Sequence, residues 1–204
     1  MTDRAEAPEE TVRLFQYGSN MARERFIERI EEEYGRHAPP GTPVVATLLG
    51  AARLDGWRLR ANLWSATQER KKQRDPSIGD DRACRVANIV RDDGAEVWGA
   101  LYDIAAALVT RCDGERSVVD RLEGHRTTQD PENYAKICVT VDLDGESRTA
   151  WTYIGLREAI DRCEREHPGT VCDPCYADTV IAGAKSIDVP DEYLKIVREA
   201  LDHR

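Results

Sequence analysis

The order of β-prone and helix-prone segments is the feature that most limits the folds open to this chain. Successive β-prone runs are joined by short turns, the sequence has no internal repeat, and strands do not alternate with helices. A doubly wound α/β fold requires that alternation, so this class is excluded. The pattern predicts an α+β fold built on an antiparallel sheet or a small barrel.

Length and local composition indicate one folded unit. The chain has 204 residues, a length that suits a single domain with a sizeable core. Residues 1–10 are acidic and lack periodicity. We therefore expect a disordered lead-in over 1–10 and a single domain over 11–204.

The charge balance argues against nucleic acid as a partner. There are 29 Lys and Arg residues against 38 Asp and Glu, a net charge of −9, and the one basic cluster is the short run 70–74. Phosphate binding depends on a larger basic footprint. No apolar run approaches the roughly 20 residues of a membrane span, and the first residues resemble no secretory signal. We expect a cytoplasmic monomer or homodimer that binds neither nucleic acid nor membrane.

The N-terminal part predicts a strand, a tight turn and an amphipathic helix. The β-prone run 12–17 leads into Gly18-Ser19-Asn20, and apolar residues then recur at helical spacing from Phe26 to Tyr34. Ser19 or Asn20 is predicted to cap this helix, with backbone N–H groups of its first turn facing the turn.

Later segments predict further strands and two hairpins. β-prone runs cover 44–49, 57–64, 85–90, 97–102, 137–141 and 149–154. Asp92-Asp93-Gly94 predicts one hairpin and Asp144-Gly145 a second, while Asp55-Gly56 predicts a turn before the run 57–64.

Helical signals occupy fewer places. Residues 117–122 predict a short helix that ends at Glu123-Gly124. The chain from Pro174 predicts one helix, and a last helix follows Val189-Pro190.

Four short motifs occur in order along the chain. They are the turn Tyr17-Gly18-Ser19-Asn20-Met21, the strand Val97-Trp98-Gly99, Leu122-Glu123-Gly124, and Tyr176 followed by Gly183-Ala184-Lys185. Their order and spacing resemble the γ-glutamylcyclotransferase-like (AIG2-like) superfamily, from residue 12 to about residue 200. This resemblance implies a small mixed or antiparallel β-barrel with peripheral helices.

The resemblance also implies an activity. A cyclotransferase lets the α-amino group of a γ-glutamyl amide attack its own γ-carbonyl and releases 5-oxoproline and a free amine, a reaction of glutathione metabolism that needs no cofactor. Glu123 would be the general acid/base, a role that suits a carboxylate whose pKa is raised by partial burial.

The remaining site candidates come from the turn and from two tyrosines. Consecutive backbone N–H groups at a helix start form an anion-binding concavity, which suits the substrate carboxylate or a developing oxyanion. Positions similar to Tyr134 and Tyr176 line the family's substrate pocket. The substrate-binding candidates are thus Tyr17, Gly18, Ser19, Asn20, Tyr134 and Tyr176.

Other chemistries remain open or lack support. Cys163, His167, Cys172 and Cys175 are candidate zinc ligands or a candidate disulfide, although their spacing fits no standard zinc motif, and we expect no bound metal. No sequence context favours a Ser/His/acid hydrolase, and neither a P-loop nor a dinucleotide-binding glycine motif occurs.

Two questions of function stay open in the sequence. The alternative to an enzyme is a non-catalytic small-molecule-binding or regulatory module on the same fold. Within the enzyme class, the leaving amine could be an amino acid, a polyamine, an isopeptide or a natural-product precursor. The segments 65–82 and 155–173 fall outside the common motif pattern, so we expect them to govern that choice.

Overall fold

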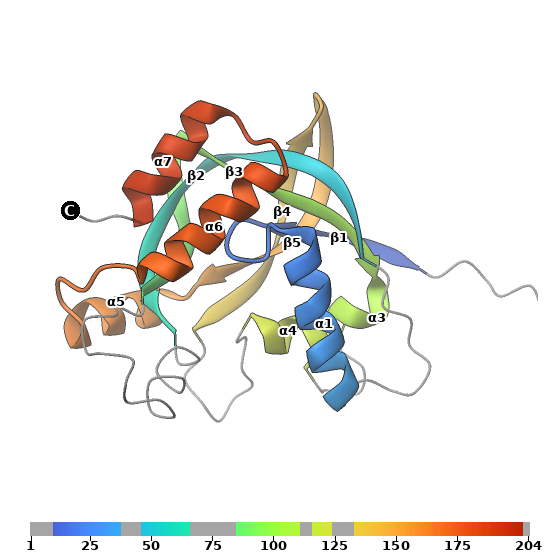
Figure 1. Ribbon diagram of the computed structural model, residues 1–204, viewed down its shortest axis with the longest axis horizontal. Helices are drawn as coiled ribbons and strands as arrows, with labels where there is room; N and C mark the ends of the chain where they lie inside the picture. Colours follow the sequence, from blue (N-terminus) through green and yellow to red (C-terminus); the bar gives the residue numbers. More distant parts are fainter. Residues whose placement is uncertain (1–9, 38–45, 66–84, 111–115, 124–132, 202–204) are drawn as a thin grey trace, which may run out of the picture.

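A closed β-barrel with helices around it makes up the described part of the protein. The computed structural model (Figure 1) describes residues 10–37, 46–65, 85–110, 116–123 and 133–201, and its strands close in the order β1-β3-β2-β4-β5. The strands are β1 Thr11–Gln16, β2 Ala46–Trp64, β3 Arg85–Ala105, β4 Tyr134–Leu143 and β5 Glu146–Gly155. This is the predicted α+β class, and the barrel is mixed because β1 and β5 run parallel.

The helices lie outside the barrel wall. They are α1 Arg23–His37, α3 Ala106–Val109, α4 Val118–Leu122, α5 Arg157–Glu166, α6 Pro174–Ser186 and α7 Asp191–Leu201. Figure 1 shows α6 and α7 on one side of the barrel and α1, α3 and α4 at its lower end. Helix α1 packs against α4, and α5 packs against β2.

The long pair β2–β3 corrects two of the predicted turns. Residues 85–90 and 97–102 were expected to form a hairpin, but both belong to the single strand β3, and both halves pair with β2. Asp55 pairs with Glu96 and Trp57 with Arg91, so residues 92–95 bulge opposite Gly56. Both turn signals therefore fall at one bulge. Strands β2 and β3 bend there but remain paired with each other on both sides of it.

The predicted hairpin at Asp144-Gly145 is confirmed. Strands β4 and β5 pair from Tyr134–Gly155 to Leu143–Glu146 without a register shift. Asp144 has φ 55° and Gly145 φ 84°, the two positive values that a type I′ turn requires.

Strand β1 closes the barrel against β5. Leu14 is the residue of β1 that pairs with Trp151 in the parallel register. The buried Thr152 hydroxyl donates to the Phe15 carbonyl at 2.9 Å, and the Tyr17 hydroxyl donates to the Tyr153 carbonyl at 2.6 Å. Side-chain hydrogen bonds thus supplement a short backbone contact at this seam.

The helix predictions are mostly confirmed. Helix α4 begins at the predicted place, where Ser117 and Asp120 form a reciprocal capping box. The predicted cap of α1 is wrong: Gly18 to Met21 form a separate turn, closed by the Met21 N–H and the Gly18 carbonyl at 3.2 Å, and α1 starts at Arg23. Helix α5 was not predicted. Residues 1–9 of the expected lead-in, and residues 66–82 of the segment 65–82, lie outside the described residues.

Candidate functional site

Glu123 lies where helix α4 ends. Its backbone N–H donates to the Val119 carbonyl at 2.9 Å, which places Glu123 at the C-cap. Its half-buried side chain accepts a hydrogen bond from Asn20 Nδ2 at 2.7 Å. Two of the predicted motifs, 103 positions apart, therefore meet at one hydrogen bond.

The surroundings of Glu123 favour its protonated form more than water does. Burial raises the pKa of the Glu123 carboxyl above its ordinary value, and this outweighs the opposing effects of the Arg29 charge and of the Asn20 and Gln16 amides. A raised pKa makes a carboxyl group better suited both to accept a proton and to return it. Glu123 therefore has the properties of a general acid/base.

Gln16 and Arg29 belong to this site, although their sequence context gave no signal for them. Gln16 ends β1, is 5% exposed, and lies close enough to Glu123 to lower its pKa. Among the described residues, no group forms a hydrogen bond of regular geometry with its Nε2 atom. Arg29, on α1, donates to Asn20 Oδ1 and to the Leu122 carbonyl. Only the folded chain brings these side chains to Glu123.

Three predicted tyrosines surround the same carboxyl group. Burial raises the pKa of the hydroxyls of Tyr17, Tyr134 and Tyr176, and in each case the negative charge of Glu123 raises it further. All three hydroxyls therefore stay protonated at neutral pH and can donate hydrogen bonds. Tyr17 already donates to the Tyr153 carbonyl, so its hydroxyl also ties the turn to β5.

The Tyr176 hydroxyl lies against the glycine of the turn. Its oxygen accepts a hydrogen bond from the Ala87 N–H at 3.1 Å. A Cβ atom added to Gly18 would lie 3.6 Å from that hydroxyl, so the missing side chain leaves room beside it. Ser19 lies half-buried in the same turn. The structure thus brings the turn, Glu123, Tyr134 and Tyr176 close together.

The candidate zinc ligands lie in a different setting. The His167 ring stacks on Trp64 with 3.4 Å between ring centroids, and the Cys172 thiol contacts the Arg85 carbonyl at 3.3 Å. Cys163, Cys172 and Cys175 are free thiols. Within the described ranges, no group of three or more His, Cys, Asp or Glu residues is arranged to hold a metal ion. The geometry therefore supports neither the zinc site nor the disulfide.

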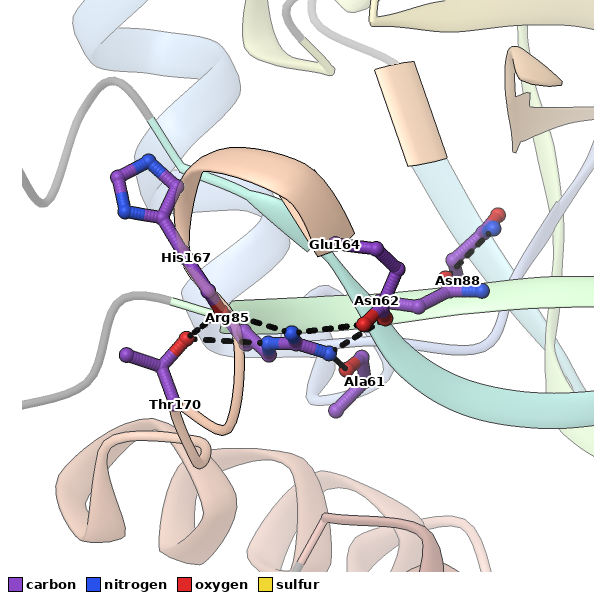
Figure 2. A network of polar contacts seen from close by, with 7 residues as sticks. All are labelled: Ala61, Asn62, Arg85, Asn88, Glu164, His167 and Thr170. Atoms are coloured by element: carbon purple, nitrogen blue, oxygen red, sulfur yellow. Dashed lines mark hydrogen bonds and ion pairs between the residues drawn. The ribbon is translucent and has the colours of Figure 1, made fainter. Parts of the chain in front are cut away.

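Residues of the segment 155–173 instead bind the side chain of a buried arginine that belongs to β3. Figure 2 shows Arg85, at the start of β3, enclosed by residues of α5 and the following loop. Its guanidinium donates to both Glu164 carboxylate oxygens at 2.7 and 3.1 Å, to the His167 carbonyl at 2.9 Å and to the Thr170 hydroxyl at 3.2 Å. This bidentate contact fixes α5 to the barrel wall.

The fold and the site together define a small α+β barrel protein with a desolvated carboxyl group beside a glycine-containing turn. A family model described as "Gamma-glutamyl cyclotransferase, AIG2-like" matches residues 14–170, and the chain belongs to this family. Tyr176, α6 and α7 lie beyond the matched residues. No curated protein matches this chain at a significant level.

Solved structures share the fold at low sequence identity. An uncharacterized protein from Homo sapiens has a TM-score of 0.63 at 21% identity, covering 96% of this chain and 90% of that one. A structure named gamma-glutamyl cyclotransferase has a TM-score of 0.57 at 20% identity, with the same two coverages, 96% and 90%. YkqA from Bacillus subtilis has a TM-score of 0.60 at 18% identity, and the match covers 96% of this chain and 55% of YkqA. In the described part of the chain, no helix is long and apolar enough to span a membrane.

Proposed function

We propose that this protein is a γ-glutamyl cyclotransferase with Glu123 as its general acid/base. The observation that carries the proposal is the hydrogen bond from Asn20 in the turn to a Glu123 carboxyl group whose burial raises its pKa. Family membership supports the same reaction class. The substrate is a γ-glutamyl amide of low molecular mass.

The reaction needs one group to move a proton twice. The α-amine of the substrate attacks its γ-carbonyl carbon, a new C–N bond closes the five-membered ring, and the amine proton passes to Glu123. The original amide C–N bond then breaks, and the same proton passes from Glu123 to the leaving amine. 5-Oxoproline and a free amine are the products, and no oxidant or external nucleophile is consumed.

The site offers two ways to lower the barrier of this reaction. Proton transfer by a positioned carboxyl group contributes roughly 10²- to 10⁴-fold. Holding the amine and the carbonyl at near-attack distance contributes several kcal/mol more, on the order of 7 in favourable intramolecular cases. In this proposal the protonated Tyr134 and Tyr176 hydroxyls and the N–H groups of the turn orient the substrate and stabilise its oxyanion.

The direct test of the proposal is the variant Glu123→Gln. Glutamine keeps the shape of the side chain but cannot take up a proton, so 5-oxoproline release should fall by at least about 10²-fold. Product is measured by chromatography with a panel of γ-glutamyl amino acids, γ-glutamyl alkylamines and γ-glutamyl-lysine isopeptide. Circular dichroism and thermal unfolding of the variant serve as the fold control.

Two results would contradict the proposal. Equal release by wild type and Glu123→Gln would remove Glu123 from the chemistry. Binding of panel compounds by calorimetry without release of 5-oxoproline from any of them would favour the non-catalytic binding module.

A further inference from the structure

The Glu123 carboxyl group is held through a second residue that is itself fixed. Asn20 Nδ2 donates to Glu123 Oε1, while Asn20 Oδ1 accepts from Arg29 Nη1. Arg29 also donates from Nη2 to the Leu122 carbonyl at 3.0 Å. One guanidinium therefore holds both the side chain that contacts Glu123 and the backbone beside it.

The direction of these hydrogen bonds follows from their chemistry. A guanidinium only donates, so its contact with Asn20 requires the amide oxygen on the Arg29 side. That choice turns the NH₂ group toward Glu123, which must then accept. Arg29 thus excludes the flipped amide, in which two acceptors would face each other across the site.

The contact with Leu122 acts on the helix that carries Glu123. The last carbonyls of a helix have no partner within the helix. Leu122 is the final residue of α4, and its carbonyl receives the second Arg29 donor. The end of α4 is therefore attached to α1, and the backbone of Glu123 with it.

We propose that Arg29 is a positioning residue that holds Glu123 in place for proton transfer through the Asn20 amide and the Leu122 carbonyl. The proposal rests on the proposed function for its catalytic consequence, whereas its structural part can be measured without substrate. Arg29 and Glu123 bond opposite ends of the Asn20 amide, so Arg29 acts on Glu123 through Asn20.

The charges and hydroxyls around Glu123 come from several elements. They are Arg29 on α1, Tyr17 after β1, Tyr134 on β4, Tyr153 on β5 and Tyr176 on α6. The tyrosines are neutral at neutral pH, so Arg29 is the charged group of this set. Its positive charge lowers the pKa of Glu123 against the larger effect of burial. Removing that charge should raise the pKa of Glu123 further.

The test is a titration of the Glu123 carboxyl carbon by NMR in the full-length protein, assigned with Glu123→Gln. In Arg29→Gln, we expect Glu123 to titrate at higher pH than in wild type. The control is Lys195→Gln, which removes an exposed cation on α7 that is not among the groups acting on Glu123, and it should leave the titration unchanged. Equal titration in wild type and folded Arg29→Gln would overturn the proposal.

A second variant separates orientation from charge and applies even if Arg29→Gln does not fold. Arg29→Lys keeps the charge, but its single ammonium group cannot fork to both acceptors. We expect the Asn20 side-chain NH₂ protons to exchange with water faster in this variant than in wild type. Unchanged protection of those protons would overturn the positioning role.

Kinetics then connect the inference to catalysis. Because a general base must be deprotonated, kcat/KM rises with pH through the pKa of Glu123, and this rise should move to higher pH in Arg29→Gln. In Arg29→Lys we expect kcat to fall roughly 10- to 100-fold with little change in KM, since a small misplacement suffices for such a loss. A protein with no activity on any substrate would contradict the proposed function, while the two NMR measurements would still decide the role of Arg29.

Discussion

At the scale of single residues, two glycines of the motifs serve different purposes. Gly99 lies on β3, where an added Cβ would come 2.4 Å from the Gln16 carbonyl oxygen and 2.8 Å from the Phe15 ring. Gly18 has no such conflict, because its added Cβ would be 3.6 Å from the nearest atom, the Tyr176 hydroxyl. Gly99 is therefore needed for packing of the barrel, whereas a methyl group at Gly18 would fit and would contact the Tyr176 hydroxyl.

This contrast gives a paired prediction for alanine variants. Gly99→Ala should lower the free energy of unfolding by about 1 to 3 kcal/mol, because overpacking forces β1 away from β3. Gly18→Ala should leave stability nearly unchanged but reduce 5-oxoproline release, because its methyl group fills the space beside the Tyr176 hydroxyl. Urea unfolding and product assays measure the two effects. A stable Gly99→Ala protein would refute the first half, and a fully active Gly18→Ala protein the second.

At the scale of elements, helix α4 is attached to the barrel through a buried carboxylate. Asp120 is 0% exposed, accepts from the Tyr153 hydroxyl at 2.8 Å, and pairs with Lys136 at 3.0 Å. Lys136 also donates to the Val109 carbonyl at 2.6 Å, which brings α3 into the same network. The short α4 thus depends on β4, β5 and α3 for its place.

Because of Asp120, the free energy of unfolding should decrease as the pH falls in the acid range. Burial raises the pKa of Asp120, but the Tyr153, Lys136 and Ser117 interactions together lower it below the ordinary value. A group with a depressed folded-state pKa stabilises above its unfolded pKa, which is about 3.9, and loses that contribution as pH falls through the lower folded value.

The variant Asp120→Asn tests this dependence. At pH 7 it should cost on the order of 3 kcal/mol, because it leaves the partly buried Lys136 without its counter-charge. The difference from wild type should shrink below about pH 4. Asp103→Asn removes a half-exposed ion pair with Arg13 and should cost less than about 1 kcal/mol. Equal costs for the two variants in denaturant titrations would contradict the role of Asp120.

The elements also indicate how far sequence reasoning reaches. Asp144-Gly145 and Asp92-Asp93-Gly94 carry similar turn signals, yet only the first connects two strands. The difference is the partner: β4 and β5 pair with each other, whereas both halves of β3 pair with β2, a long-range choice that local residues do not encode. Helix α5 was missed because its buried side chains are the small Ala159 and Cys163 among many charged residues.

The candidate site also contains residues that the sequence marks and residues that only the fold brings together. The turn at residues 17–20 and Glu123 were predictable because motifs mark them, and the fold brings them into contact. Gln16 and Arg29 were not, because a glutamine at a strand end and an arginine on a charged helix have many ordinary roles. Their positions beside Glu123 arise only when β1, α1 and α4 converge.

At the scale of the whole molecule, the barrel depends on a thin seam. The backbone register between β1 and β5 is short, with Leu14 paired to Trp151, and the Thr152 hydroxyl supplies a buried hydrogen bond to the Phe15 carbonyl. Strands β2 and β3, in contrast, pair along nearly their full lengths. The pairing of β2 with β4 is equally short, with Arg53 paired to Asp142, so the seam is one of two places where neighbouring strands of the wall share little backbone pairing.

Thr152→Val should weaken that seam while preserving its shape. Valine leaves the Phe15 carbonyl without its side-chain donor, at a cost of about 1 to 3 kcal/mol. Hydrogen exchange should then increase first in β1 and β5. Thr140→Val, at an exposed position of β4, is the control and should change neither quantity. Uniform exchange across all strands in Thr152→Val would show that the seam does not open separately.

The contacts at the seam between β1 and β5 join residues that are far apart in the sequence, and this bears on when they form during folding. The two side-chain bonds of the seam join residues 136 and 137 positions apart, and the bond between Asn20 and Glu123 spans 103 positions. Closing such long loops has an entropic cost that must be met before these contacts form, so non-local pairing of this kind is slow. Local hairpins and helices can therefore assemble while the acid and its turn are still apart. A chain in which this closure has not happened therefore lacks the hydrogen bond that joins Asn20 to Glu123.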